Sequence, residues 1–231
     1  MKLRLDLVLG ALFLIVSCVA SDNAGPTGMR FEEKDSLVLP VRVHLLANTN
    51  TTDIHTRLTD ADVTRIFGKV NRVWSQAGIR FQVESVVRES AVMPLEQGPN
   101  EIPMLQTRHL LALRPAVSRA TNLLHVYYVH RLPVNGIYFR EAIFVKDTAS
   151  LREVEGGIDE PIPRVTSHEL GHALKLDHRQ NRTNLMASGT TGIALNTDEI
   201  DRARRAAKEL LLHLAADNFS GGLKANRSIP R

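Results

Sequence analysis

Four residues between positions 168 and 178 have the types and spacing of a metal-dependent hydrolytic centre. His168 and His172 are four residues apart. On an α-helix of about 3.6 residues per turn they lie one turn apart on one face and can bind the same metal ion. Glu169 projects about 100° further round that helix, where it can hold a metal-bound water as general base more easily than it can bind the ion. The pattern predicts a catalytic Zn²⁺ site, with water at an open position.

A third histidine, His178, places a demand on the backbone. It follows His172 by about 240° of helical rotation, so an unbroken helix would point its imidazole away from the other two. Binding by His178 therefore requires the helix to end near residues 175–177. If His178 is not the third ligand, the alternative is the downstream carboxylate of Glu199. The short pattern of His168, Glu169 and His172 also arises by chance in structural helices, which leaves a site without metal as a further alternative.

The run His168-Glu169-Leu170-Gly171-His172, followed by His178 and by Asn184-Leu185-Met186, resembles the active site of metzincin zinc endopeptidases, above all their matrixin-like branch. The resemblance implies that His168, His172 and His178 bind Zn²⁺ and that Glu169 is the general base and acid. Met186 would be the methionine of the Met-turn beneath the metal. No tyrosine follows Met186 where astacin-like and serralysin-like members carry an extra ligand. The implied activity is hydrolysis of peptide bonds through a zinc-activated water.

One residue departs from the family pattern. Lys175 stands where metzincins usually have glycine, at the point where the active-site helix ends in a conformation that glycine adopts easily. Lys175 therefore affects the geometry of the turn that must bring His178 back to the metal.

Upstream, the apolar spacing predicts a β-α-β unit. Residues 37–46 alternate as a half-buried strand, with Arg42 and His44 on its polar face. Residues 60–77 have helical spacing, with Thr59 or Asp60 as the cap and Gly78 after the end. Residues 79–87 alternate again, so the two strands should pair in parallel.

Further strands are predicted around a central apolar run at 123–129, which His125 and His130 flank as structural or surface residues. A short helix is predicted at 104–113, an edge strand at 137–139 and another strand at 142–145. The resemblance implies that extended substrate pairs with the edge strand just before the active-site helix, here Gly136, Ile137 and Tyr138 within residues 136–140.

The second half of the chain should hold two more helices. A loop over 148–163 leads to the active-site helix near Arg164, and Thr197 caps a final helix. Arg202, Arg205 and Lys208 form the solvent face of that helix. The expected fold is α+β: a metzincin-like zincin domain over residues 37–220, with a twisted mixed sheet, a long backing helix, an active-site helix and a C-terminal helix. Residues 221–231 are expected to form a flexible tail.

The first residues resemble an export signal. Lys2 and Arg4 precede an apolar run within residues 1–17, and the segment ends in a pattern similar to the lipobox of bacterial lipoproteins, with Cys18 as the lipidated residue. A lipid at Cys18 would anchor the protein to a membrane of the cell envelope. Residues 21–36 have a small and polar composition, which predicts a flexible linker over residues 18–36. The alternative is cleavage after Ala20 and release as a secreted protein.

The charge composition indicates which class of molecule the protein binds. The net charge of +4 is spread along the chain, which disfavours a nucleic-acid partner. We expect a monomer that acts on a peptide or protein substrate. A second hypothesis is a lipid-anchored, non-catalytic protein-binding module that retains the zinc site. Glu169 favours the enzyme, since a relic needs no base, and Lys175 favours the module.

Overall fold

The computed structural model describes residues 35–48, 54–92, 107–120, 123–139 and 142–225. The predicted export signal, Cys18 and most of the predicted linker lie outside these residues. The helix predicted at 104–113 lies partly outside them. None of the described helices combines the length and the apolar composition needed to cross a bilayer.

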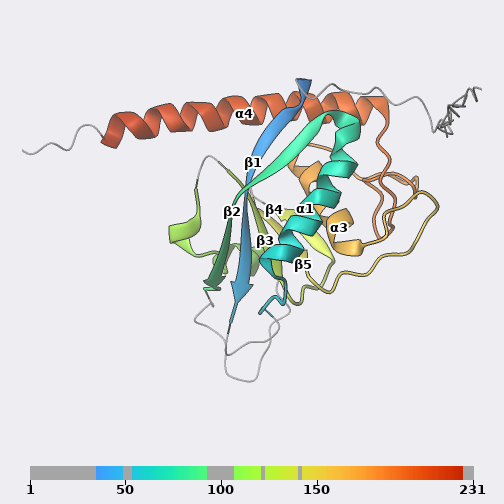
Figure 1. Cartoon of the computed structure of the whole chain (residues 1–231), viewed down its shortest axis with the longest axis horizontal. Coiled ribbons are helices and arrows are strands. Elements are labelled where there is room, and N and C mark those ends of the chain that lie inside the picture. The colour runs from blue at the N-terminus through green and yellow to red at the C-terminus, as the bar shows by residue number, and fades with distance from the viewer. Residues whose placement is uncertain (1–34, 49–53, 93–106, 121–122, 140–141, 226–231) are drawn as a thin grey trace, which may run out of the picture.

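A five-stranded sheet forms the centre of the fold (Figure 1). Its strands are β1 (Leu37–Ala47), β2 (Ile79–Ser90), β3 (Leu124–Val129), β4 (Gly136–Phe139) and β5 (Ala142–Lys146). Their order is β2-β1-β3-β5-β4, and β4 alone among them runs antiparallel to its neighbour. The predicted mixed sheet is confirmed, with β3 at its centre and β4 at one edge.

The helix α1 (Asp60–Trp74) connects β1 to β2 and covers one face of the sheet (Figure 1). Thr59 caps it in a capping box with Asp62, and the short 3₁₀ turn η2 (Ser75–Ala77) ends at Gly78, whose φ is 58°. The buried residues of α1 recur at helical spacing, as the sequence predicted, and pack into the main core against β2 and α3; they are Val63, Ile66, Phe67, Val70, Val73 and Trp74. The parallel β1–α1–β2 unit is therefore confirmed.

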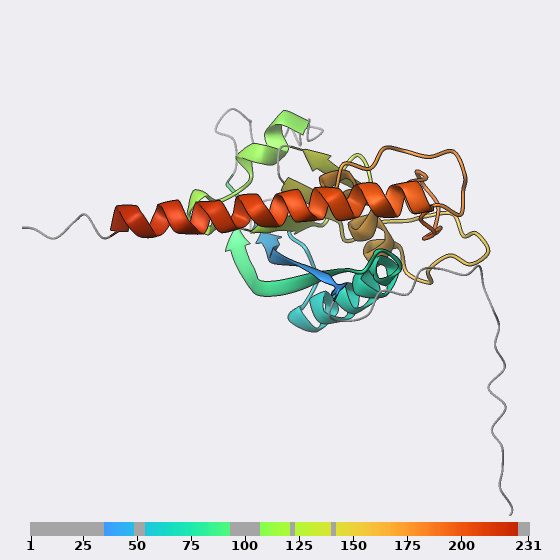
Figure 2. The ribbon, with the colours of Figure 1, turned by 90° about the horizontal axis from the view of Figure 1, so that it is seen from above.

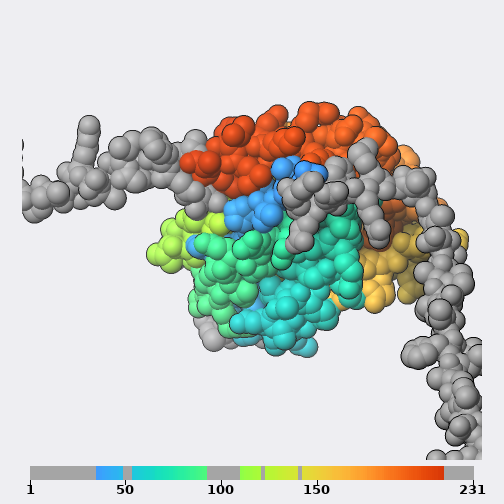
Figure 3. All heavy atoms as spheres, turned by 45° about the horizontal axis from the view of Figure 1, so that its top comes forward, coloured from blue at the N-terminus to red at the C-terminus, as the bar shows by residue number. Residues whose placement is uncertain are grey.

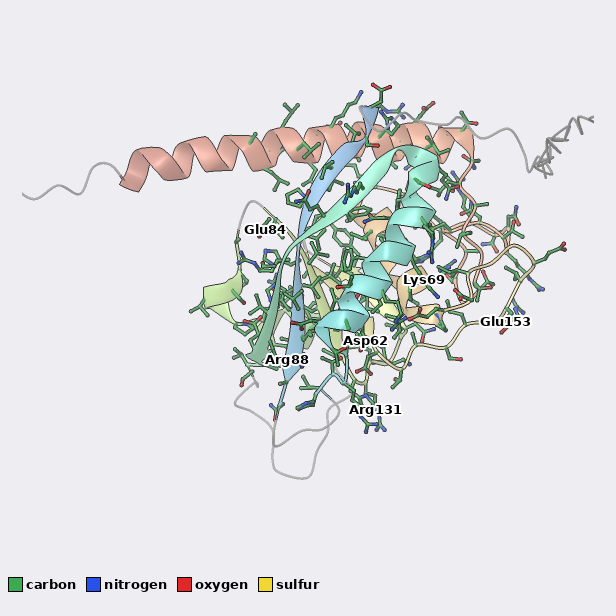
Figure 4. The ribbon with its side chains drawn as sticks, in the orientation of Figure 1. Asp62, Lys69, Glu84, Arg88, Arg131 and Glu153 are labelled. Atoms are coloured by element: carbon green, nitrogen blue, oxygen red, sulfur yellow. The ribbon has the colours of Figure 1, made fainter. Side chains whose placement is uncertain are left out.

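The helix α3 (Pro161–Ala173) carries the predicted metal ligands and starts three residues before the predicted Arg164. Two prolines, Pro161 and Pro163, indicated a loop. Proline suits the first turn of a helix, because its φ is already helical and the N–H that it lacks has no partner there. Lys69 of α1 lies toward the loop before α3 (Figure 4), with its Nζ 2.6 Å from an Asp159 oxygen and 3.0 Å from a Glu160 oxygen.

A second apolar cluster covers the other face of the sheet and corrects the prediction for His44. Residues of β1, β3 and β5 pack there against α2 (Thr107–Ala112) and its surroundings. His44 is therefore fully buried rather than on a polar face: it stacks on Tyr127 and lies 2.8 Å from His125 Nδ1 and 2.6 Å from Glu89 Oε1. His125 and His130 are structural, as predicted, since His130 Nδ1 lies 2.8 Å from Asp147 Oδ1.

The helix α4 (Thr197–Ala225) runs along one edge of the body beside the beginning of β1 (Figure 3). It packs through Ala203, Ala206 and Ala207, and Arg204 Nη1 donates to the Ala77 carbonyl oxygen at 2.8 Å. The helix continues to Ala225, into the stretch predicted to be a tail. Its first half lies at the end of the molecule that contains α3, and its last turns extend past the sheet (Figures 1 and 2).

Candidate metal centre

The helix α3 holds two of the predicted ligands in a fixed orientation. Nδ1 of His168 lies 2.8 Å from the Leu185 carbonyl oxygen, and Nδ1 of His172 lies 2.8 Å from that of Leu176. A carbonyl can only accept, so each Nδ1 carries a proton and each neutral ring presents the bare Nε2 to the site. Such contacts are typical of metal-binding histidines, because they fix both the tautomer and the ring orientation.

The helix ends in a Schellman motif at Lys175. The Leu176 N–H donates to the Gly171 carbonyl oxygen at 2.9 Å and the Lys175 N–H to that of His172 at 3.0 Å. Lys175 has a φ of 63°, and no other non-glycine residue in the described ranges has a positive φ. The lysine therefore adopts the left-handed conformation expected of the usual glycine, at a cost of about 1–2 kcal/mol.

This turn brings the third histidine back to the other two. Nε2 of His178 lies 3.2 Å from Nε2 of His172, which is also 3.2 Å from Nε2 of His168. One ligand atom from each ring lies within 4.8 Å of the others, and within the part of the chain that the structure describes these three residues form the one cluster of this kind. The helix ends at Ala173, two residues before the predicted stretch, and the turn at Lys175 supplies the reversal that ligation by His178 requires.

The chemistry of this donor set fits a metal cation. The Nε2 lone pairs of His168 and His172 face each other, and they repel unless a cation lies between them. Burial lowers the pKa of His168 to about 3, against the weaker opposing effect of the Leu185 carbonyl, so a proton is a poor counter-charge there. Three convergent imidazoles with an open side suit Zn²⁺.

The alternative ligand Glu199 lies elsewhere. Its side chain is 1% exposed and accepts from Arg179 Nε at 2.7 Å, from Asn184 Nδ2 at 2.7 Å and from the Asn196 N–H at 2.9 Å. It does not belong to the histidine cluster. Instead it supports the segment around Met186, because Asn184 Oδ1 accepts from the Met186 N–H at 2.6 Å.

Met186 is fully buried against the C-terminal part of α3. A Cβ placed on Gly171 would lie 2.5 Å from the sulfur of Met186, so the glycine allows this close approach. Gly171 precedes His172 directly, and the Leu185 carbonyl next to Met186 binds His168. The segment after His178 thus lies directly against the ligand-bearing part of α3.

Glu169 is 5% exposed and lies beside the edge strand β4. Burial raises its pKa to about 7, while a backbone hydrogen bond from Tyr138 and the charge of Arg164 act in the opposite direction. A Cβ on Gly136 would come within 2.9 Å of both the Glu169 side chain and Val165, so only glycine lets β4 approach α3 this closely.

A cleft of about 800 Å³ brings these groups together. Its walls include the three histidines, Glu169, and Gly136, Ile137 and Tyr138 of β4. The Lys146 N–H donates to the Asn135 carbonyl oxygen at 2.9 Å. Because hydrogen-bonded pairs alternate along an antiparallel ladder, the backbone groups of Ile137 face β5 and those of Gly136 and Tyr138 face the open edge.

Two arginines contribute more than the sequence indicated. Arg202, predicted on a solvent face, donates through Nη2 to the Lys175 carbonyl oxygen and to Asp177 Oδ2, both at 2.9 Å. Arg164, in the first half of α3, is buried and donates to the carbonyl oxygens of Gly192 and Ala187. Neither contact has a sequence signal, because each joins segments whose proximity depends on the tertiary fold.

Comparison with known proteins gives a likeness of fold only. No protein-family model and no curated protein matches the chain. A chain solved in a chaperone–substrate complex aligns with 78% of this chain at 11% identity and a TM-score of 0.50. This chain spans only 35% of that chain's length.

Two archaeal structures align over similar shares of the chain. Archaemetzincin from Methanopyrus kandleri matches 78% of this chain and 97% of its own length, at 15% identity and a TM-score of 0.40. A zinc-dependent peptidase from Methanocorpusculum labreanum matches 72% of this chain and 99% of its own, at 14% identity and a TM-score of 0.37. Similarity at this level assigns no activity, which must be argued from the site itself.

Proposed function

We propose that this protein is a metzincin-like zinc endopeptidase. The observation that carries the proposal is the convergence of three imidazoles beside a buried carboxylate in one cleft. His168, His172 and His178 would hold the ion, leaving one position open toward the cleft. When bound, Zn²⁺ would lower the pKa of water and polarise the scissile carbonyl as a Lewis acid.

Glu169 is the residue placed to move the proton. It follows His168 directly on α3 and lies in the same cleft, but it is not one of the three clustered ligands. As general base it would take a proton from the attacking water, and it would then pass this proton to the leaving amine. The Tyr138 N–H holds the carboxylate against β4, so the strand that would bind substrate also orients the base.

The edge strand β4 would bind an extended peptide. Gly136 directs its backbone N–H and carbonyl toward the open side of the sheet, and Tyr138 directs its carbonyl there, since its N–H is bonded to Glu169; both residues line the cleft with the histidines. A peptide added to such an edge is held by main-chain hydrogen bonds, and neighbouring pockets select its side chains. The substrate class that fits is therefore an unfolded or extended segment of protein.

Export and lipid anchoring are part of the proposal on sequence grounds alone. The apolar run within residues 1–17 and the pattern ending at Cys18 support a membrane-anchored protein of the cell envelope. Cleavage after Ala20 would instead give a secreted form, and the monomeric state also stays a prediction.

The structure gives no support to the alternative of a non-catalytic binding module. In the sequence, Lys175 at the usual glycine position favours that alternative, but the lysine adopts the left-handed turn and His178 lies beside His172. Since Glu169 is also beside the site, no observation favours a relic.

The proposal predicts metal-dependent cleavage of an unfolded protein. We expect the purified full chain to fragment a reduced, unfolded substrate, to lose this activity in a zinc chelator and to regain it when Zn²⁺ is restored. Fragments would be followed by mass spectrometry, with a Glu169→Gln preparation as control for contaminating peptidases. Cleavage that persists equally in chelator would contradict a metal-dependent mechanism.

A further inference from the structure

The turn that aims His178 at the site is held from α4. Lys175 occupies a left-handed conformation without the help of glycine, and the chain must reverse there within three residues to reach His178. The Arg202 guanidinium bonds twice to this turn, through Nη2 to the Lys175 carbonyl oxygen and to Asp177 Oδ2, each at 2.9 Å. One side chain thus bridges the first and third residues of the turn.

We propose that Arg202 is a positioning residue for the third metal ligand and replaces the backbone preference that a glycine at position 175 would supply. The inference rests on the zinc site of the proposed function. A lysine at φ 63° readily relaxes toward negative φ, and that change would carry His178 away from His172. The bond from Arg202 to the Lys175 carbonyl oxygen opposes this relaxation. The ion pair with Asp177, whose side chain is 78% exposed, adds little.

A second contact between α4 and the turn is much weaker. Lys175 Nζ lies 2.6 Å from Glu209 Oε2, but the two side chains are 70% and 56% exposed. An exposed ion pair of two flexible side chains contributes little and is screened by salt. Arg202 instead binds the Lys175 carbonyl directly, so it acts on the backbone whose φ is in question.

Arg202 is not needed to dock α4. Ala203 and Ala207 are fully buried in the main core, and Arg204 bonds to the carbonyl oxygens of Ala77 and Gly78. Removing the guanidinium of Arg202 should therefore leave α4 in place while freeing the turn. This separation makes the role testable.

The test compares Arg202→Met, Lys175→Gly and their combination in the full chain. The matched control is Arg205→Met, which removes an exposed arginine from the same helix. The readouts are the Zn²⁺ dissociation constant, from competition with a chromophoric chelator, and the melting temperature of the metal-free protein. Neither requires catalytic activity.

We expect Arg202→Met to weaken zinc binding by about tenfold, the lower end of what loss of an orienting partner costs, with the metal-free melting temperature close to that of Arg205→Met. Adding Lys175→Gly should restore most of the affinity, because glycine adopts the turn unaided. Zinc affinity of Arg202→Met equal to that of Arg205→Met, or no rescue by glycine, would overturn the inference while leaving the peptidase proposal intact. Failure of the unmutated protein to bind zinc would overturn both.

Discussion

Replacement of Glu169 by glutamine should lower the rate of peptide-bond cleavage by about 10²–10⁴-fold, the usual contribution of a general acid–base group. Glutamine keeps the shape of the side chain and an oxygen that can accept from the Tyr138 N–H, but it cannot take up a proton. Because Glu169 is not among the clustered ligand atoms, the zinc content should stay at that of the unmutated protein. The loss should appear in kcat rather than in zinc affinity.

The control for this substitution is Glu153→Gln. Glu153 is exposed on the loop before α3 (Figure 4), and it does not line the cleft. The Glu153→Gln variant should cleave the substrate at the rate of the unmutated protein. Full activity in Glu169→Gln would remove this residue from the mechanism.

Replacement of His178 by alanine should weaken zinc binding by more than about 100-fold, because a direct ligand is removed. Loss of a residue that only orients a ligand costs about 10–100-fold. The metal-free domain should be hardly affected, since His178 is exposed and its Nε2 contacts His172 within the site. Competition with a chelator would give the affinity and thermal unfolding would give the stability.

His55→Ala is the matched control for His178, because His55 is exposed and lies outside the cleft. Unchanged zinc affinity in His178→Ala would mean that the metal has a different third ligand. The buried, arginine-paired position of Glu199 argues that this carboxylate is not the substitute.

Local periodicity was sufficient to predict most of the fold. The stripe of α1, the alternation of β1 and β2 and the apolar run of β3 each depend on residues close in sequence, so a sequence pattern can report them. The errors arose where tertiary context decided the outcome. The alternation of β1 predicts His44 on a polar face, but Tyr127 and His125, which are distant in sequence, bury it. The prolines before α3 predict a loop, but proline also suits the first turn of a helix, so α3 begins earlier.

The same distinction between local pattern and tertiary context applies to the site. The spacing of His168, Glu169 and His172 predicts their arrangement, because one helix fixes all three. The position of His178 depends on Lys175 adopting a positive φ, which a lysine disfavours. Its structural basis, the contact with Arg202, joins residues 27 positions apart and has no sequence pattern.

Locating the metal would show whether His168, His172 and His178 hold one catalytic zinc ion. Anomalous diffraction at the zinc edge from crystals of the purified full chain would show its position. We expect one zinc peak about 2.0–2.1 Å from the Nε2 atom of each of His168, His172 and His178. A zinc-supplemented crystal without a peak there, or with the ion bound by other residues, would contradict it.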